Sequence, residues 1–145
     1  MPVITQFTIM KILPILFCGA IFGLSHLSNQ DDKLGKSIQR GKVIYAETCI
    51  TCHMGDGQGV SGSFPPLAKS DFLVKTPERA ISAIKFGLQG KIQVNGTEYN
   101  NVMPNPGLAN DEIADVMNYI RNLWGNTSNK KMITEEMVDA LKELK

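Results

Sequence analysis

Apolar residues recur with a helical period in three stretches of the chain. The first stretch covers residues 32–47 and predicts an amphipathic helix. The second covers residues 77–86, with Thr76 in the N-cap position and Pro77 at the first helical position. The third covers residues 110–124 and has one continuous apolar face. This pattern predicts a mainly α protein with three principal helices.

Long irregular segments separate the predicted helices. Residues 54–75 begin with a run rich in glycine and proline and are expected to form a long loop, and residues 101–107 form another. Between these loops, the sequence KIQVNGTEY predicts a small β-hairpin with a two-residue turn at Asn95-Gly96. A last amphipathic helix is expected to start near Thr134. Loops this long in a small domain indicate a function that orders them, and a large flat cofactor would do so.

The N-terminus carries an uncharged apolar run at residues 12–27, directly after Lys11. One base, a short apolar run and small residues near its end are typical of an export signal, with cleavage expected after Ser25. The run is shorter than the roughly 20 residues of a membrane-spanning helix, although residues 7–10 could extend it. An uncleaved membrane anchor therefore remains the alternative. Either way, we expect a periplasmic protein, soluble or anchored to the membrane.

The composition, with 43% hydrophobic and 20% charged residues, is that of an ordinary globular protein. Removing residues 1–25 as a signal peptide leaves 14 bases and 14 acids, and no clustered basic surface indicates a nucleic-acid partner. The expected organisation after the signal is a linker at residues 26–32 and one domain at residues 33–125. Residues 126–145 are expected to form a C-terminal extension with a short helix.

Two of the three cysteines and one of the two histidines lie in the five-residue sequence CITCH, as Cys49, Cys52 and His53. A Cys-x-x-Cys disulfide closes a tiny loop and stabilises little, and a thioredoxin-like thiol pair needs a βαβ context that is missing here. A structural zinc site needs four N or S ligands, but after export the chain offers only these three and His26. A haem explains every residue type: the two thiols bond to the vinyl groups of one porphyrin, and the histidine binds its iron.

The opposite face of the iron needs a second donor, and soft thioether or imidazole groups are the candidates. Met103 lies in a loop 50 residues beyond His53, just before a helix, and is the predicted second ligand. Met54 adjoins the histidine, and Met117 lies on the apolar face of a helix. Because two protein ligands leave the iron no open position, the predicted function is one-electron transfer rather than catalysis. A single C-x-x-C-H motif predicts one haem c.

With these motifs, the chain resembles the class I c-type cytochromes over about residues 33–125. The sequences CITCH, GQGVSGSFPPLA, VMP and EIADVMNYIRNLWGN carry the resemblance. It implies the cytochrome c fold, in which three principal helices and long loops surround one covalently bound haem. In that family the N-terminal helix crosses the last helix through a glycine and an aromatic residue. Gly41 and Tyr45 match the first helix of this crossing, and Val116 with Tyr119 matches the second.

The resemblance also assigns roles around the haem and in the cell. The carbonyl of Pro65 would hold the imidazole N–H of the proximal histidine, and Leu67 would cover the ring. The implied function is a one-electron carrier that cycles between Fe(III) and Fe(II) and serves respiratory or dehydrogenase partners. The alternative is a haem-bearing subunit of a larger dehydrogenase, oxidase or nitrite reductase complex, with residues 133–144 as its docking helix. Packing of this helix on its own domain is the preferred interpretation because its apolar face is narrow.

Overall fold

The structure is a computed structural model that describes residues 31–128 and 131–143. The predicted signal segment, residues 1–25, lies outside the described residues. The chain divides into two compact units, and the fold described below is that of the second, Leu34–Lys145. Of the helices that can be described, none is both long and apolar enough to cross a membrane.

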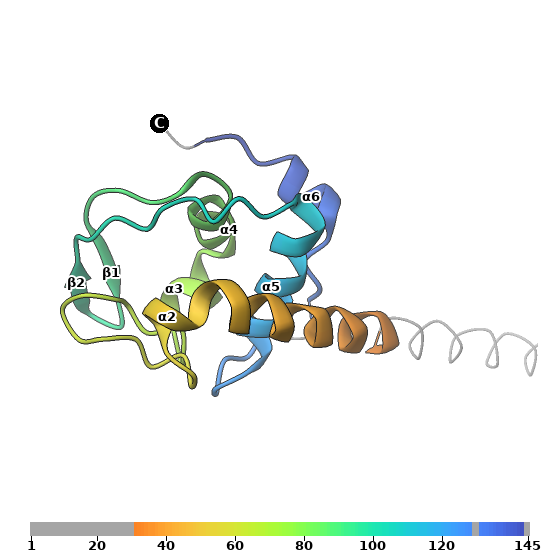
Figure 1. The fold of residues 1–145 in the computed structure, drawn as a ribbon, viewed down its shortest axis with the longest axis horizontal. Helices are drawn as coiled ribbons and strands as arrows, with labels where there is room; N and C mark the ends of the chain where they lie inside the picture. The colour runs from red at the N-terminus through yellow and green to blue at the C-terminus, as the bar shows by residue number, and fades with distance from the viewer. Residues whose placement is uncertain (1–30, 129–130, 144–145) are drawn as a thin grey trace, which may run out of the picture. The chain divides into compact units, whose positions relative to one another are not determined.

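A continuous helical segment leads into the Cys-x-x-Cys-His motif. Residues 31–44 are α-helical, the π-helical turn η1 covers Tyr45–Cys49, and α2 covers Ile50–His53 (Figure 1). The sequence predicted a helix that ends near residue 47, so the observed helical segment is longer at its C-terminal end. It continues because the Ile50 N–H reaches the carbonyl of Tyr45, five residues earlier, and thereby widens one turn.

Two short helices follow the glycine-rich loop. The helix α3 covers Asp71–Lys75 and was not predicted, because a five-residue helix carries too few apolar repeats to be recognised. The helix α4 covers Pro77–Phe86, as its start and stop signals predicted. Thr76 has the N-cap position, but its hydroxyl donates to the carbonyl of Phe72 (2.8 Å) and makes no capping bond to α4. The position of the cap was predicted correctly, whereas its expected hydrogen bond is absent.

The predicted hairpin is confirmed. Strands β1 (Ile92–Val94) and β2 (Thr97–Tyr99) pair antiparallel, with Ile92 opposite Tyr99. Asn95 and Gly96 have φ values of 50° and 80°, the positive values that a two-residue primed turn requires. Alternation along the strands places Ile92, Val94 and Tyr99 together on the buried face.

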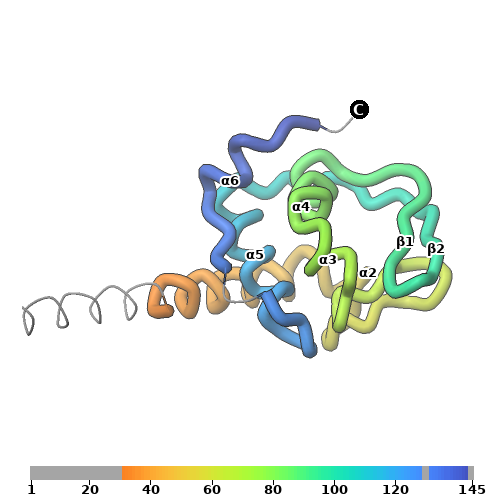
Figure 2. The backbone as a smooth tube through the Cα atoms, turned by 180° about the vertical axis from the view of Figure 1, so that it is seen from behind, coloured from red at the N-terminus to blue at the C-terminus, as the bar shows by residue number. Residues whose placement is uncertain are grey.

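The last two helices pack on each other. The helix α5 covers Asn110–Asn122 and begins where the sequence predicted, although it ends before the expected stop at Gly125 because Leu123 is extended. The helix α6 covers Glu135–Asp139, and its N-cap residue Thr134 accepts a bond from a first-turn N–H. Figure 2 shows α6 beside α5, and the contacts between the two helices agree. The C-terminal helix therefore packs on its own domain, which was the preferred interpretation of its narrow apolar face.

The N-terminal helix crosses α5 at Gly41. A Cβ atom at this position would overlap the backbone carbonyl of Asp115 and approach the Cβ of Tyr119 to 2.8 Å. One turn later, Tyr45 packs its ring 5.5 Å from Tyr119 and 5.0 Å from Trp124, measured between ring centroids. The predicted mainly α architecture and the predicted glycine-mediated helix crossing are both confirmed.

Candidate functional site

The cysteines and the histidine lie at the end of the N-terminal helical segment. Cys49 is the last residue of η1, and Cys52 and His53 belong to α2. Both thiols are half-buried and are not joined in a disulfide. Burial, with a smaller contribution from Cys52, raises the pKa of Cys49 to about 11. A thioredoxin-like pair needs an attacking thiol with a lowered pKa, so this thiol pair is poorly suited to disulfide exchange.

The imidazole of His53 is buried and held by the loop that follows it. Its Nδ1 lies 3.1 Å from the carbonyl oxygen of Pro65, which can only accept a hydrogen bond. This contact makes Nδ1 the protonated nitrogen and leaves Nε2 with a lone pair for a metal ion. Burial lowers the pKa of His53, and the bond to Pro65 offsets part of the effect. The histidine is therefore neutral at pH 7, the form that binds metals.

Gly59 allows the loop to bring this carbonyl close to the histidine. Its φ is 63°, and its N–H donates to the carbonyl of His53 at 3.1 Å. A Cβ at Gly59 would overlap the carbonyl of Phe64 and lie 2.7 Å from that of Pro65. A glycine is thus required here both by the backbone conformation and by the close approach of the chain.

An apolar cavity opens beside the histidine. Among the predicted site residues, its wall contains Cys49, His53, Pro65, Leu67 and Met103. A second cavity of about 470 Å³ is lined by Cys52, His53, Pro65 and Met103. Because the cavities share several wall residues, they are two parts of one cleft. The structure thus brings all six predicted site residues to this cleft.

Met103 approaches the cleft from a separate loop. Its N–H donates to the carbonyl of Leu88 (2.9 Å), and the N–H of Leu88 donates back to its carbonyl (2.8 Å). Gly87 has a φ of 85° and allows the Met103 loop to pack closely against it, since a Cβ there would lie 3.0 Å from the Met103 carbonyl oxygen. Met54 and Met117, the methionines set aside from the sequence, line neither cavity.

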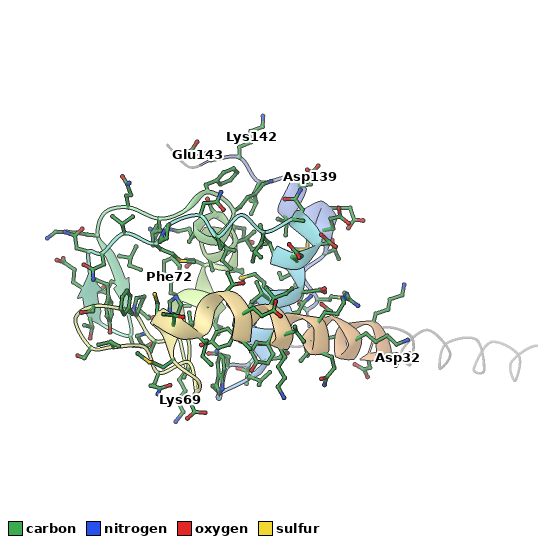
Figure 3. The ribbon with its side chains drawn as sticks, in the orientation of Figure 1. Asp32, Lys69, Phe72, Asp139, Lys142 and Glu143 are labelled. Carbon is green, nitrogen blue, oxygen red and sulfur yellow. The ribbon has the colours of Figure 1, made fainter. Side chains whose placement is uncertain are left out.

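Several wall residues were missed by reasoning from the sequence. Ile92 of β1 lines both cavities, and Tyr99 of β2 lines the second. Phe72 of α3, labelled in Figure 3, lines the first and packs against both core clusters. The alternation of apolar and polar residues in the hairpin indicated which of its faces is buried, but only the tertiary structure shows that this face meets the cleft.

The cleft suits a covalently attached haem. It offers two thiols on adjacent turns, one imidazole with Nε2 available, one thioether from a distant loop, and an apolar wall. These are the donors and the surroundings that iron porphyrins have in electron-transfer proteins. Within residues 31–128 and 131–143, no group of three or more His, Cys, Asp or Glu side chains could hold a metal ion.

Comparisons with known proteins agree with this donor set. Residues 38–124 match the family model for cytochrome c. Cytochrome c-552 of Thermus thermophilus is 39% identical over 110 residues, which cover 72% of this chain and 83% of that protein. The cytochrome c subunit of the quinone alcohol dehydrogenase of Gluconobacter oxydans is 34% identical over 93 residues, covering 61% of this chain but only 19% of that protein. The cytochrome c subunit of gluconate 2-dehydrogenase from Pantoea cypripedii is 32% identical over 124 residues, covering 79% of this chain and 28% of that protein.

Proposed function

Because the chain belongs to the cytochrome c family and functions in electron transfer, we propose that it carries one electron at a time on a single haem c. Cys49 and Cys52 would attach the haem through thioether bonds, and His53 and Met103 would bind the iron. The observation that carries the proposal is the meeting of the Cys-x-x-Cys-His motif and a distant thioether at one apolar cleft.

The protein's own residues would set the properties of this electron carrier. When bound, the haem supplies an iron that alternates between Fe(III) and Fe(II). The Pro65 carbonyl orients the imidazole of His53 and keeps its proton on Nδ1. As an iron ligand, the thioether of Met103 would favour the reduced state. The apolar wall, to which Leu67 contributes, would exclude water and disfavour the extra charge of the oxidised state. If His53 and Met103 both held the iron, small molecules would have no open site on it.

The cellular setting is proposed from the N-terminal sequence and the relatives. The uncharged run after Lys11 supports export to the periplasm, with residues 1–25 as a signal peptide or, alternatively, as a membrane anchor. Relatives named as cytochrome c subunits of dehydrogenases and as a subunit of a cbb3-type cytochrome c oxidase support redox proteins as partners. The domain would cover residues 33–125, with residues 126–145 as its extension.

A free carrier is favoured over a permanent subunit of a larger complex. The segment considered as a docking helix has Ile133 and Val138 fully buried, and α6 packs on α5. Its apolar residues are therefore used within the domain. The two alternatives differ in the size of the native protein on size exclusion, where migration with a large dehydrogenase or reductase would contradict the free carrier.

Visible spectra of the oxidised and reduced protein, together with its intact mass, test the proposal. We expect a mass increase of one haem and a spectrum with histidine and methionine ligands, and the mass also reports N-terminal processing. The Cys49→Ala variant should lose normal covalent attachment, because one thioether bond cannot form. Cys18→Ala is the matched control, and this variant should retain normal covalent attachment of the haem. A fully normal thioether adduct in the Cys49→Ala protein would contradict the proposed attachment.

A further inference from the structure

The loop that carries Met103 is fastened to the end of α4. This loop, residues 100–109, connects β2 to α5 and runs past α4 in Figure 2. Met103 pairs with Leu88 through the backbone. In addition, the side chain of Asn105 donates from Nδ2 to the carbonyl of Lys85 (2.9 Å). The carbonyls in the last turn of a helix have no partner within the helix, so this bond satisfies one of them. The position of the Met103 loop therefore depends on the place of Lys85.

The side chain of Lys85 in turn binds the C-terminal segment, residues 131–143. Its Nζ donates to the carbonyls of Val138 (2.8 Å), Asp139 (3.3 Å) and Leu141 (3.3 Å). These carbonyls lie at the C-terminal end of α6, where a positive charge is favourable. An ammonium group that satisfies three carbonyls holds this end of the segment firmly on α4.

The same segment also contacts the far end of the loop. Asn110, the first residue of α5, donates from Nδ2 to the carboxylate of Asp139 at 3.1 Å. Figure 3 labels Asp139 at α6, where the chain enters α5. The segment is itself fixed, because buried Asn118 exchanges two hydrogen bonds of 2.8 Å with the backbone of Ile133. The segment thus binds Lys85, to which the middle of the Met103 loop is fastened, and also Asn110, which follows the C-terminal end of the loop.

From these contacts we propose that the C-terminal segment is a positioning element for Met103 and acts through Lys85. It keeps the loop closed, so that the thioether stays at the iron and other ligands are excluded. This inference rests on the proposed ligation by Met103. Loops with few buried contacts open at a low free-energy cost, so each anchor sets the fraction of molecules in which the methionine is displaced.

Binding of imidazole to the oxidised holoprotein measures this open fraction directly. Imidazole occupies the iron only when the methionine leaves, so its apparent affinity rises with the open population. We expect the Lys85→Met protein to bind imidazole about tenfold more tightly than the wild type, the effect of losing hydrogen bonds to a charged group. Asn105→Ala, at an exposed position of the loop, should act in the same direction and provides a second test if the Lys85→Met protein fails to fold.

Two controls separate positioning from general stabilisation. Lys42→Met removes an exposed lysine of the N-terminal helix and should leave the imidazole affinity unchanged. In the Met103→Ala background, Lys85→Met should have no further effect, because no methionine is left to displace. Far-UV circular dichroism of each variant checks that the helices are intact.

The outcomes distinguish this inference from the proposed function. If Met103→Ala binds imidazole no more tightly than the wild type, Met103 is not an iron ligand and both proposals fail. If Met103→Ala binds it much more tightly but neither Lys85→Met nor Asn105→Ala does, the proposed function stands and the positioning role is overturned. An equal gain in imidazole affinity in the Lys42→Met protein would also overturn the positioning role.

Discussion

His53 has the properties of a metal ligand before any metal is considered. The residue is 8% exposed, and the Pro65 carbonyl 3.1 Å from Nδ1 determines the tautomer of its ring. Burial lowers the pKa of the imidazole, so that the uncharged form is the stable one near neutral pH. The remaining nitrogen is thus available as a donor without the loss of a proton. An iron ligand needs this preparation, because a protonated imidazole has no lone pair to give.

Replacing Met103 tests the second ligand. We expect Met103→Ala to lose the spectroscopic signature of methionine ligation and to lower the midpoint potential by about 0.1 V or more, because a thioether stabilises Fe(II). Met137→Leu is the control, since this methionine of α6 is half-buried and lines neither cavity. Spectroelectrochemical titration of both variants measures the change. An unaltered oxidised spectrum and midpoint in the Met103→Ala protein would show that another group binds the iron.

At the scale of residues, chemistry that depends on rare side chains could be predicted from the sequence. The chain has three cysteines and two histidines, so their spacing left little choice for Cys49, Cys52 and His53. Met103 was selected among seven methionines by its place in a loop far from the histidine. The apolar residues of the wall could not be predicted in this way. Ile92 is one of many buried aliphatic residues, and only the tertiary arrangement brings it to the cleft.

At the scale of elements, the crossing of the N-terminal helix and α5 organises the fold. Gly41 lies directly on the backbone of Asp115, and Ser37 donates a buried hydrogen bond of 2.6 Å to the carboxylate of Asp115. Arg40 donates two further hydrogen bonds to the same carboxylate. This hydrogen bonding raises the pKa of the Arg40 guanidinium. Close backbone contact and a shared acidic side chain therefore fix the register of the two helices.

Gly41→Ala should destabilise this crossing. The added methyl group would overlap the Asp115 carbonyl, so the helices must separate, at a cost of about 1–3 kcal/mol in the free energy of unfolding. Gly35→Ala is the matched control in the same helix, because a Cβ there meets nothing within 4 Å. It should raise the free energy of unfolding by about 0.5–1 kcal/mol through helix propensity alone. Denaturant unfolding measures both, and equal effects of the two substitutions would contradict the close-contact interpretation.

The elements that were predicted correctly carry strong local signals. The hairpin turn at Asn95-Gly96 needs positive φ values that few residues adopt, and α4 has proline and glycine at its ends. The elements that were missed depend on tertiary contacts. The helix α3 is only five residues long, and the extension of the N-terminal helix to His53 passes through a π-helical turn without a sequence signature. Local signals therefore predicted where the chain turns better than where short helices form.

At the scale of the whole molecule, the cleft lies between the two hydrophobic clusters. The larger cluster includes residues of α4 and α5, and the smaller one consists of Ile92, Val94 and Tyr99 of the hairpin. Residues of both clusters line the first cavity, whose wall is almost wholly apolar. A haem held there would supply dispersion contacts to this wall, so the cofactor would act as part of the core.

The haem-free chain should consequently lack a unique fold. We expect the Cys49→Ala/Cys52→Ala double variant, purified without haem, to retain helical circular dichroism from the crossing at Gly41, because that contact does not involve the cleft. The hairpin and the Met103 loop should become mobile, since the cleft wall that they form would have nothing to pack against. Such a state binds hydrophobic dyes and has lost near-UV circular dichroism.

Denaturant unfolding distinguishes this state from a native apoprotein. The slope of the unfolding free energy with denaturant scales with the surface that unfolding exposes, so it should be much smaller for the haem-free chain than for the holoprotein. The free energy of unfolding of a domain of this size is only about 5–15 kcal/mol. We expect loss of the cofactor contacts to remove most of this stability. A steep cooperative transition in the haem-free variant, with the slope of the holoprotein, would show that the fold closes without its cofactor. In that case the cleft would be a preformed binding site, and attachment of the haem would follow folding rather than complete it.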